Sequence, residues 1–197
     1  MHERVIALPC GHTTCYLVVG AMGTLLVDTG FAGTLGLLGR GLKSHGLGIQ
    51  DVSCLLVTHF HPDHMGIAQD LVDLGVTFLL PTCQLPYVHM PDRMYARDHN
   101  EAFRPINENA ALRVELPEIR RLLHDRCGID GTVARTPGHS PDSISLVLDQ
   151  GDAFVGDLCP SDQVCLYEDE AMGASWETIL SLGTHTIHFA HWPGETI

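Results

Sequence analysis

The chain has 197 residues and a formal net charge of −13, from 11 Lys and Arg against 24 Asp and Glu. A hydrophobic content of 45% excludes a disordered chain, and the length favours a single domain over residues 1–197. The excess of negative charge argues against nucleic acid or an anionic membrane as a partner, so we expect a small-molecule substrate. Thirteen histidines outnumber lysine and arginine together, and histidine is the commonest metal ligand.

The sequence shows no sign of secretion or of a membrane anchor. The apolar run at residues 5–8 is too short for the core of a signal peptide. No stretch approaches the roughly 18 apolar residues that a membrane span needs. The seven cysteines are an odd number and include no CxxC pair, which fits a reducing compartment with free thiols. We therefore expect a cytoplasmic protein.

Hairpins and βα units alternate along the chain. Two β-rich runs around a glycine-containing turn predict a hairpin, and a strand, helix and strand farther on have the spacing of a βαβ unit. The predicted ranges are strands 14–19 and 24–27, helix 34–45, strand 52–58, helix 65–74, strand 76–80, helix 117–127, strands 132–136, 143–148 and 153–155, helix 170–182 and strand 186–190. This order predicts an α/β fold with a mixed sheet, or two sheets, and helices outside.

Residues 81–116 are predicted to form an irregular insertion, because prolines break any long helix there. These prolines are Pro81, Pro86, Pro91 and Pro105. The segment also contains Tyr87 and Tyr95, which we consider as substrate-binding residues. Loops of this length are usually functional or covered. Two alternatives stay open: a lid over the site, or a surface that packs on the core or on the second subunit of a homodimer.

The run HFHPDH, from His59 to His64, carries four metal-binding groups directly after a predicted buried strand. In extended backbone, residues i and i+2 point to the same side, so His59 and His61 can bind one metal ion. Asp63 and His64 are adjacent and can face a second ion. Imidazole and carboxylate ligands suit zinc, with iron and manganese as alternatives.

Three further candidate ligands follow other predicted strands: His139, Asp157 and His191. Sites in α/β folds gather at the carboxyl ends of strands. His188 lies within the last strand and is the alternative to His191, which we favour because it ends that strand. Together with the first motif, these residues complete a set of three ligands per metal and one bridging carboxylate.

These motifs, together with the Asp-Thr-Gly turn at residues 28–30, occur in the order typical of the metallo-β-lactamase superfamily, which the chain resembles over nearly its whole length. The resemblance implies a four-layer αββα sandwich, with two mixed sheets and helices on the outer faces. It also implies that Asp28 is structural or supports a ligand. The implied ligands are His59, His61 and His139 for one metal, Asp63, His64 and His191 for the second, and Asp157 as the bridge.

The resemblance extends to glyoxalase II-like and lactonase-like members, so we expect a dinuclear metal-dependent hydrolase of a small ester, lactone or thioester. Two divalent ions make a bridging hydroxide available at neutral pH. Asp63 would orient this hydroxide and carry a proton to the leaving group. The alternative is a mononuclear iron-dependent oxidoreductase similar to the persulfide dioxygenases. A phosphodiesterase is disfavoured by the acidic charge, and a β-lactamase by the bridging aspartate.

The sequence departs from two subfamilies. Glyoxalase II enzymes carry a helical glutathione-binding domain, whereas six residues follow His191 here, so we expect that domain to be absent. Lactonases place a tyrosine three residues after the bridging aspartate, where this chain has Pro160. Assistance to the leaving group would then come from another residue, such as Tyr87, Tyr95 or Tyr167.

Overall fold

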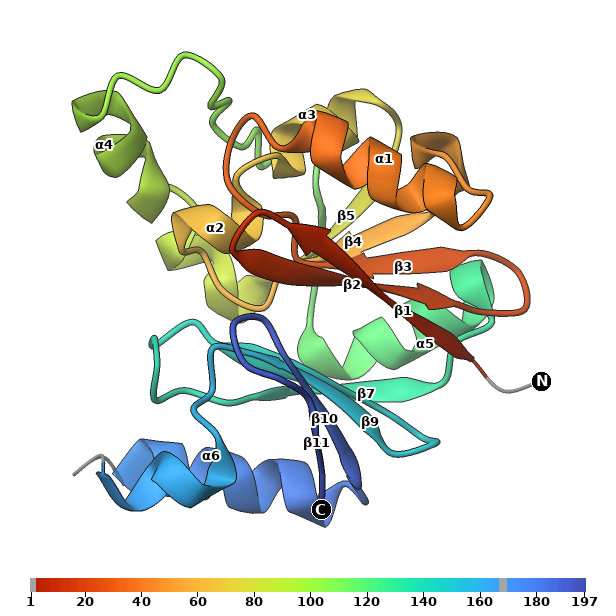
Figure 1. Cartoon of the computed structure of the whole chain (residues 1–197), viewed down its shortest axis with the longest axis vertical. Coiled ribbons are helices and arrows are strands. Elements are labelled where there is room, and N and C mark those ends of the chain that lie inside the picture. The colour runs from red at the N-terminus through yellow and green to blue at the C-terminus, as the bar shows by residue number, and fades with distance from the viewer. Residues whose placement is uncertain (1–2, 167–169) are drawn as a thin grey trace.

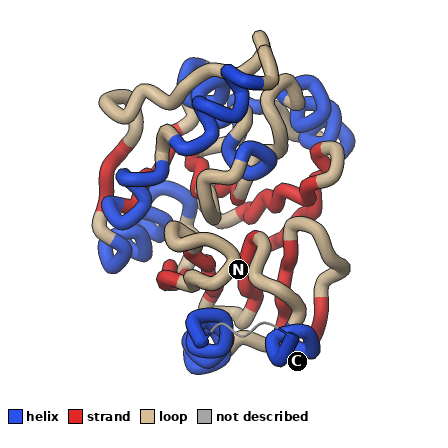
Figure 2. The backbone as a smooth tube through the Cα atoms, turned by 90° about the vertical axis from the view of Figure 1, so that its left-hand side faces the viewer, coloured by secondary structure: helices blue, strands red, loops and turns tan. Residues whose placement is uncertain are grey.

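The computed structural model describes residues 3–166 and 170–197, and its two sheets lie face to face between outer helices (Figures 1 and 2). The strand order is β1-β2-β3-β4-β5-β6 in the first sheet and β11-β10-β9-β8-β7 in the second. The strands are β1 (Arg4–Cys10), β2 (Thr13–Val19), β3 (Thr24–Val27), β4 (Cys54–Leu56), β5 (Thr77–Pro81), β6 (Leu112–Val114), β7 (Gly131–Arg135), β8 (Ile144–Leu148), β9 (Asp152–Gly156), β10 (Thr186–Phe189) and β11 (Glu195–Thr196).

The helices cover the outer faces of both sheets and close one side of the sandwich. The α-helices are α1 (Leu35–Ser44), α2 (Pro62–Met65), α3 (Ala68–Asp73), α4 (Met90–Arg97), α5 (Leu116–Cys127) and α6 (Glu170–Ser181). The short 3-10 turns are η1 (Ile49–Asp51), η2 (Thr82–Tyr87) and η3 (Ser161–Leu166). Within the described ranges, no helix is long and apolar enough to cross a bilayer.

Buried side chains form three cores, one at each interface between layers. Leu38 of α1 and Leu71 of α3 lie in the first core, between the helices and the first sheet. Leu56 and Phe154 lie in the second core, between the two sheets. Trp176 of α6 closes the third core on the outer face of the second sheet. Because burying one large apolar side chain contributes about 1.5–3 kcal/mol, the three cores together hold the four layers in register.

Both sheets mix parallel and antiparallel pairs, which confirms the predicted αββα sandwich. The predicted hairpin is present, with β2 and β3 antiparallel, and β4, α3 and β5 form the predicted parallel unit. The helix expected over 65–74 instead divides into α2 and α3. Pro62 starts α2 early, because proline suits the first turn of a helix, and the break follows at Gly66, whose N–H donates to Gly30 O.

The expectation of an irregular segment over 81–116 is wrong in part, because η2, α4 and β6 all lie within it. Pro91 occupies the first turn of α4, where a proline costs the helix no hydrogen bond. Strand β1 was also not predicted. It pairs along its length with β2 and buries alternate residues, including Ile6 and Leu8, as expected for period-two patterning.

The two sheets come into close contact where β9 ends, at Gly156. Its φ of +58° lies in the left-handed region that favours glycine. A Cβ atom there would lie 2.5 Å from Thr58 Oγ1, which belongs to the segment after β4. Gly156 therefore allows the backbone of the second sheet to touch the end of a strand of the first.

The Gly156→Ala variant should be less stable than the native chain by at least about 1–2 kcal/mol, the cost of left-handed backbone for an L-residue, with the Thr58 collision added. The free energy of unfolding in urea measures this. Gly39→Ala is the matched control, because Gly39 is inside α1 with open space around it. That variant should gain up to about 1 kcal/mol from helix propensity. Equal stability of the two variants would contradict the role given to Gly156.

Candidate metal centre

Strand ends from both sheets meet at one edge of the sandwich. In the second sheet β7, β9 and β10 run in one direction, since β8 is antiparallel to both β7 and β9 while β10 is parallel to β9. His139, Asp157 and His191 follow these three strands. His59 follows β4 of the first sheet. The fold thus brings together residues that are up to 132 positions apart, as 191 − 59 shows.

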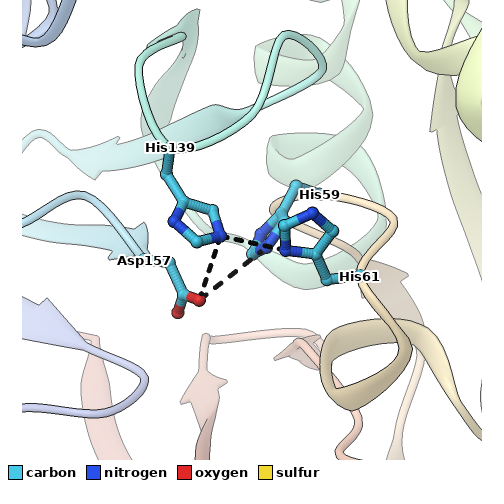
Figure 3. A group of neighbouring side chains, drawn as sticks. All are labelled: His59, His61, His139 and Asp157. Carbon is cyan, nitrogen blue, oxygen red and sulfur yellow. Dashed lines mark hydrogen bonds and ion pairs between the residues drawn. The ribbon is translucent and has the colours of Figure 1, made fainter.

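The first group consists of His59, His61, His139 and Asp157, whose ligand atoms all lie within 4.8 Å of one another (Figure 3). The His139 Nε2 atom is 2.9 Å from His61 Nδ1 and 3.3 Å from Asp157 Oδ2. The distance from His59 Nε2 to Asp157 Oδ2 is 3.9 Å. Three ring nitrogens and one carboxylate oxygen therefore surround a single point.

The second group consists of Asp63, His64 and His191. The His191 Nε2 atom lies 2.9 Å from Asp63 Oδ2, and His64 Nε2 lies 3.6 Å from the same oxygen. Asp157 reaches this group with its other oxygen, because Oδ1 is 3.2 Å from His64 Nε2 and 3.3 Å from His191 Nε2. The two oxygens of one carboxylate thus face two different groups.

Three buried atoms at this edge make no well-formed hydrogen bond to any described residue: His59 Nε2, His64 Nε2 and Asp157 Oδ1. A buried polar atom without a partner is costly, so these atoms call for a partner outside the chain. Ligands about 2.0–2.1 Å from a tetrahedral ion are about 3.3 Å from one another. The distances within both groups bracket this value, so the residues fit a pair of metal ions.

The electrostatics of the site favour cations. Burial lowers the pKa of His59 and of His139, which keeps both imidazoles neutral and able to ligate. Burial alone would also lower the pKa of His64, but the carboxylates of Asp28 and Asp157 outweigh it and raise the pKa. The carboxylates around His64 thus favour positive charge at this place, and the same attraction acts on a metal ion.

The profile of the metallo-β-lactamase superfamily matches residues 8–191, which is nearly the whole chain and includes all seven residues of the two groups. The chain belongs to the metallo-β-lactamase superfamily. The chain is similar to the protein TTHA1623, with 28% sequence identity and a TM-score of 0.72. The crystal structure of that protein is of a di-iron-bound form. That match covers 98% of this chain and 94% of the other.

Two further relatives match this chain over only part of their own length. The atrochrysone carboxyl ACP thioesterase of Aspergillus fumigatus is 27% identical over 148 residues, covering 74% of this chain and 29% of the relative. The β-lactamase-like protein 2 homolog of Drosophila melanogaster is 26% identical over 187 residues, covering 91% of this chain and 58% of the relative. The chain thus spans less than two thirds of the length of either protein.

Asp28 supports the site and belongs to neither group, in agreement with the expectation from the sequence. Its Oδ2 accepts hydrogen bonds from His64 Nδ1, at 2.8 Å, and from Thr58 Oγ1, at 2.9 Å, while Oδ1 accepts one from Thr58 N, at 2.7 Å. On the other side of the second group, His191 Nδ1 donates to the carbonyl oxygen of His12 at 2.9 Å. These bonds engage Nδ1 of His64 and of His191, so in both histidines Nε2 is the ring nitrogen that faces the centre.

Asp142 is a supporting residue that the sequence does not single out. It is 3% exposed, and its Oδ2 accepts a 2.7 Å hydrogen bond from Phe60 N, between two histidines of the first group. Its Oδ1 accepts a 2.7 Å bond from Ser140 Oγ, beside His139. Asp142 therefore ties together the two loops that carry the histidines of the first group. Its place in an ordinary polar loop, 82 residues from Phe60, gives no local signal.

The remaining candidate site residues are His188, Tyr95 and Tyr87, and the structure gives each of them different contacts. His188 pairs with Asp152, with 2.7 Å between Nε2 and Oδ1, so His191 is the histidine brought to the second group. Tyr95 is buried, and its hydroxyl donates to Pro62 O, so that hydroxyl is engaged with backbone. A substrate-binding role for Tyr87, which is half-buried against the first core, stays a prediction.

Tyr167, the third tyrosine considered as an aid to the leaving group, lies outside the described residues.

The Asp142→Ala variant should be less stable than the native chain by about 1–3 kcal/mol, because Phe60 N and Ser140 Oγ lose a buried acceptor. Asp149→Ala is the matched control, since Asp149 forms an exposed ion pair with Arg120 and its loss should cost at most about 1 kcal/mol. Urea unfolding followed by circular dichroism compares the two variants. A smaller loss for Asp142→Ala than for Asp149→Ala would refute the tie between the loops.

Proposed function

We propose that this chain is a dinuclear metal-dependent hydrolase that acts on a small ester, lactone or thioester. The observation that carries the proposal is the position of Asp157, whose two carboxylate oxygens face separate groups of histidines. A single carboxylate between two such groups is suited to bridging two cations. The unpartnered Nε2 atoms of His59 and His64 support this reading.

In the proposed site, His59, His61 and His139 hold one ion, Asp63, His64 and His191 hold the other, and Asp157 lies between them. Zinc is the expected metal, since imidazole and carboxylate ligands in three-residue sets are typical of catalytic zinc. Iron and manganese are the alternatives, and the di-iron form of the relative TTHA1623 supports considering iron.

When bound, a pair of divalent ions supplies Lewis acidity that activates water and polarises a carbonyl group. Asp63 is the residue proposed to move protons. Its Oδ2 is held by Thr13 Oγ1 at 3.2 Å and lies 2.9 Å from His191 Nε2. Held in this way, Asp63 can accept a proton from the attacking water and return it to the oxygen or sulfur of the leaving group.

The range of substrates is proposed from chemistry and from relatives. In the proposed reaction water is the nucleophile, so no nucleophilic side chain is needed. The substrate then needs only an acyl group that water can attack, as in an ester, lactone or thioester. The relative from Aspergillus fumigatus is named a thioesterase, which supports including thioesters. The acidic net charge of −13 gives no support for a phosphodiester polymer as substrate.

The first test is the metal content of protein purified without added metal, measured by elemental analysis. Two divalent ions per chain are expected, and His61→Ala should lower this content because it removes a nitrogen from the first group. The matched control is His124→Ala, which removes an exposed histidine of α5 that pairs with Asp130 and belongs to neither group. Its metal content should equal that of the native chain.

A single iron per chain would overturn the dinuclear proposal. It would favour the alternative of an iron-dependent oxidoreductase, which oxygen uptake with thiol and persulfide substrates would then test. Equal metal content in native and His61→Ala protein would instead remove His61 from the site.

The second test is hydrolysis of a panel of small thioesters, lactones and esters. The Asp63→Asn variant keeps the size of the side chain but cannot carry the proton, so kcat should fall by about 10²–10⁴-fold. Asp125→Asn, at an exposed residue that pairs with Arg121, is the control and should leave kcat unchanged. The metal content of each variant is measured alongside, so that loss of metal is separated from loss of proton transfer.

A native kcat in metal-replete Asp63→Asn protein would exclude Asp63 as the proton carrier. Absence of turnover on every substrate of the panel by native protein containing two ions per chain would overturn the proposed function itself.

A further inference from the structure

An apolar pocket of about 140 Å³ lies directly against the first group of proposed ligands. One wall is the loop that carries the HxHxDH motif, and the other is helix α4, which lies beside α2 in Figure 1. The lining residues are Phe60, His61, Pro62, Met90, Pro91 and Met94. His61, a proposed metal ligand, is therefore also a lining residue of this pocket.

A buried hydrogen bond joins the two walls. The Tyr95 hydroxyl, from α4, donates to Pro62 O at 2.7 Å and accepts from Ala32 N at 3.1 Å. The Tyr95 ring stacks on Phe103, with 4.1 Å between ring centroids. Tyr95 is 5% exposed, so these bonds are shielded from water. The helix is thus fixed to the metal loop, and the pocket is already formed in the free protein.

The chemistry of the lining selects an apolar occupant. No carboxylate, lysine or arginine lines the pocket, and the His61 ring is its one polar side chain. Water in such a space finds few hydrogen-bond partners, so an apolar group displaces it favourably. An apolar cavity of about 150 Å³ accommodates one benzene ring. The size of the pocket therefore suits a phenyl ring or a short branched alkyl chain.

The position of Asp63 indicates which end of the substrate enters the pocket. The leaving group must face Asp63, which lies in the second group with His64 and His191. The pocket instead adjoins His61, in the first group. A scissile carbonyl placed between the groups would direct its leaving group towards Asp63 and its acyl side chain towards Met90 and Met94.

We propose that this pocket binds the acyl group of the substrate and makes the enzyme selective for short apolar acyl groups, up to about the size of a benzoyl group. The inference rests on the proposed hydrolase function for its catalytic meaning. The methionines set the depth of the pocket, because their flexible, polarizable side chains adapt to small apolar ligands.

Binding is tested without catalysis by NMR of the zinc-loaded protein labelled at the methionine methyl groups, of which the chain has six. Benzoate, the product expected from a benzoyl ester or thioester, is the probe. Acetate is the matched control, because it has the same carboxylate without the ring. Benzoate should shift the methyl signals of Met90 and Met94, and acetate should not. Met22, in the turn between β2 and β3, should not respond to either.

Selectivity is tested with the ratio of kcat/KM for a benzoyl thioester to that for an acetyl thioester. Met94→Phe fills the pocket and should lower this ratio by at least about tenfold, the scale of discrimination in a hydrophobic pocket. Met94→Ala enlarges the pocket and should shift the preference towards longer acyl groups. Met22→Phe is the control for a methionine outside the pocket and should leave the ratio unchanged.

The outcomes separate this inference from the proposed function. If the native protein hydrolyses no member of the panel but benzoate shifts Met90 and Met94, the pocket is supported as a binding site and the hydrolase function fails. If hydrolysis occurs, but the ratio is the same in Met94→Phe and benzoate shifts neither methionine, the acyl pocket is overturned and the hydrolase function stands.

Discussion

The carboxylate of Asp157 is the contact on which the arrangement of the site depends. It is 9% exposed and lies within 3.9 Å of nitrogens from both groups. A buried carboxylate is stable only when positive charge or hydrogen-bond donors surround it, so strand ends from both sheets must converge on this point. The same edge joins the sheets, because Ile144 N donates to Thr58 O and Gly156 packs on Thr58. Forming the site and closing the sandwich are therefore one structural event.

The convergence of the candidate ligands could be predicted from the sequence, because the segments that carry them follow apolar strands and strand ends are where α/β folds gather polar groups. The run from His59 to His64 is dense enough in metal-binding side chains to be conspicuous without the fold. The choice of His191 over His188 could also be made, since only residues beyond the strand end project past the sheet edge. Strand β1 could not be predicted in the same way, because the continuous apolar run at residues 5–8 hides its period-two burial.

The contacts that hold the ligands in place are less predictable, because they join residues that are distant in sequence. Asp142 bonds to Phe60 across 82 positions, and the Tyr95 hydroxyl meets Pro62 across 33 positions. From the sequence, a tyrosine in a segment expected to be a loop is a candidate for contact with substrate. In the fold, the Tyr95 hydroxyl instead attaches α4 to the loop that carries Pro62. The helix itself is obscured by Pro91, since a proline in a loop-like segment and a proline in the first turn of a helix look the same in sequence.

His61 stands both in the first group of ligands and in the wall of the apolar pocket. The pocket thus has one wall that includes a residue of the first group and a second wall, on α4, that includes none. Met90 and Met94 lie on α4, outside both groups. If the pocket binds the acyl group as proposed, substitutions at these two positions change the range of substrates and leave the residues of both groups intact. Under that proposal, substrate preference can change through substitutions on the pocket-facing side of α4 alone, independently of the residues proposed to hold the metal ions.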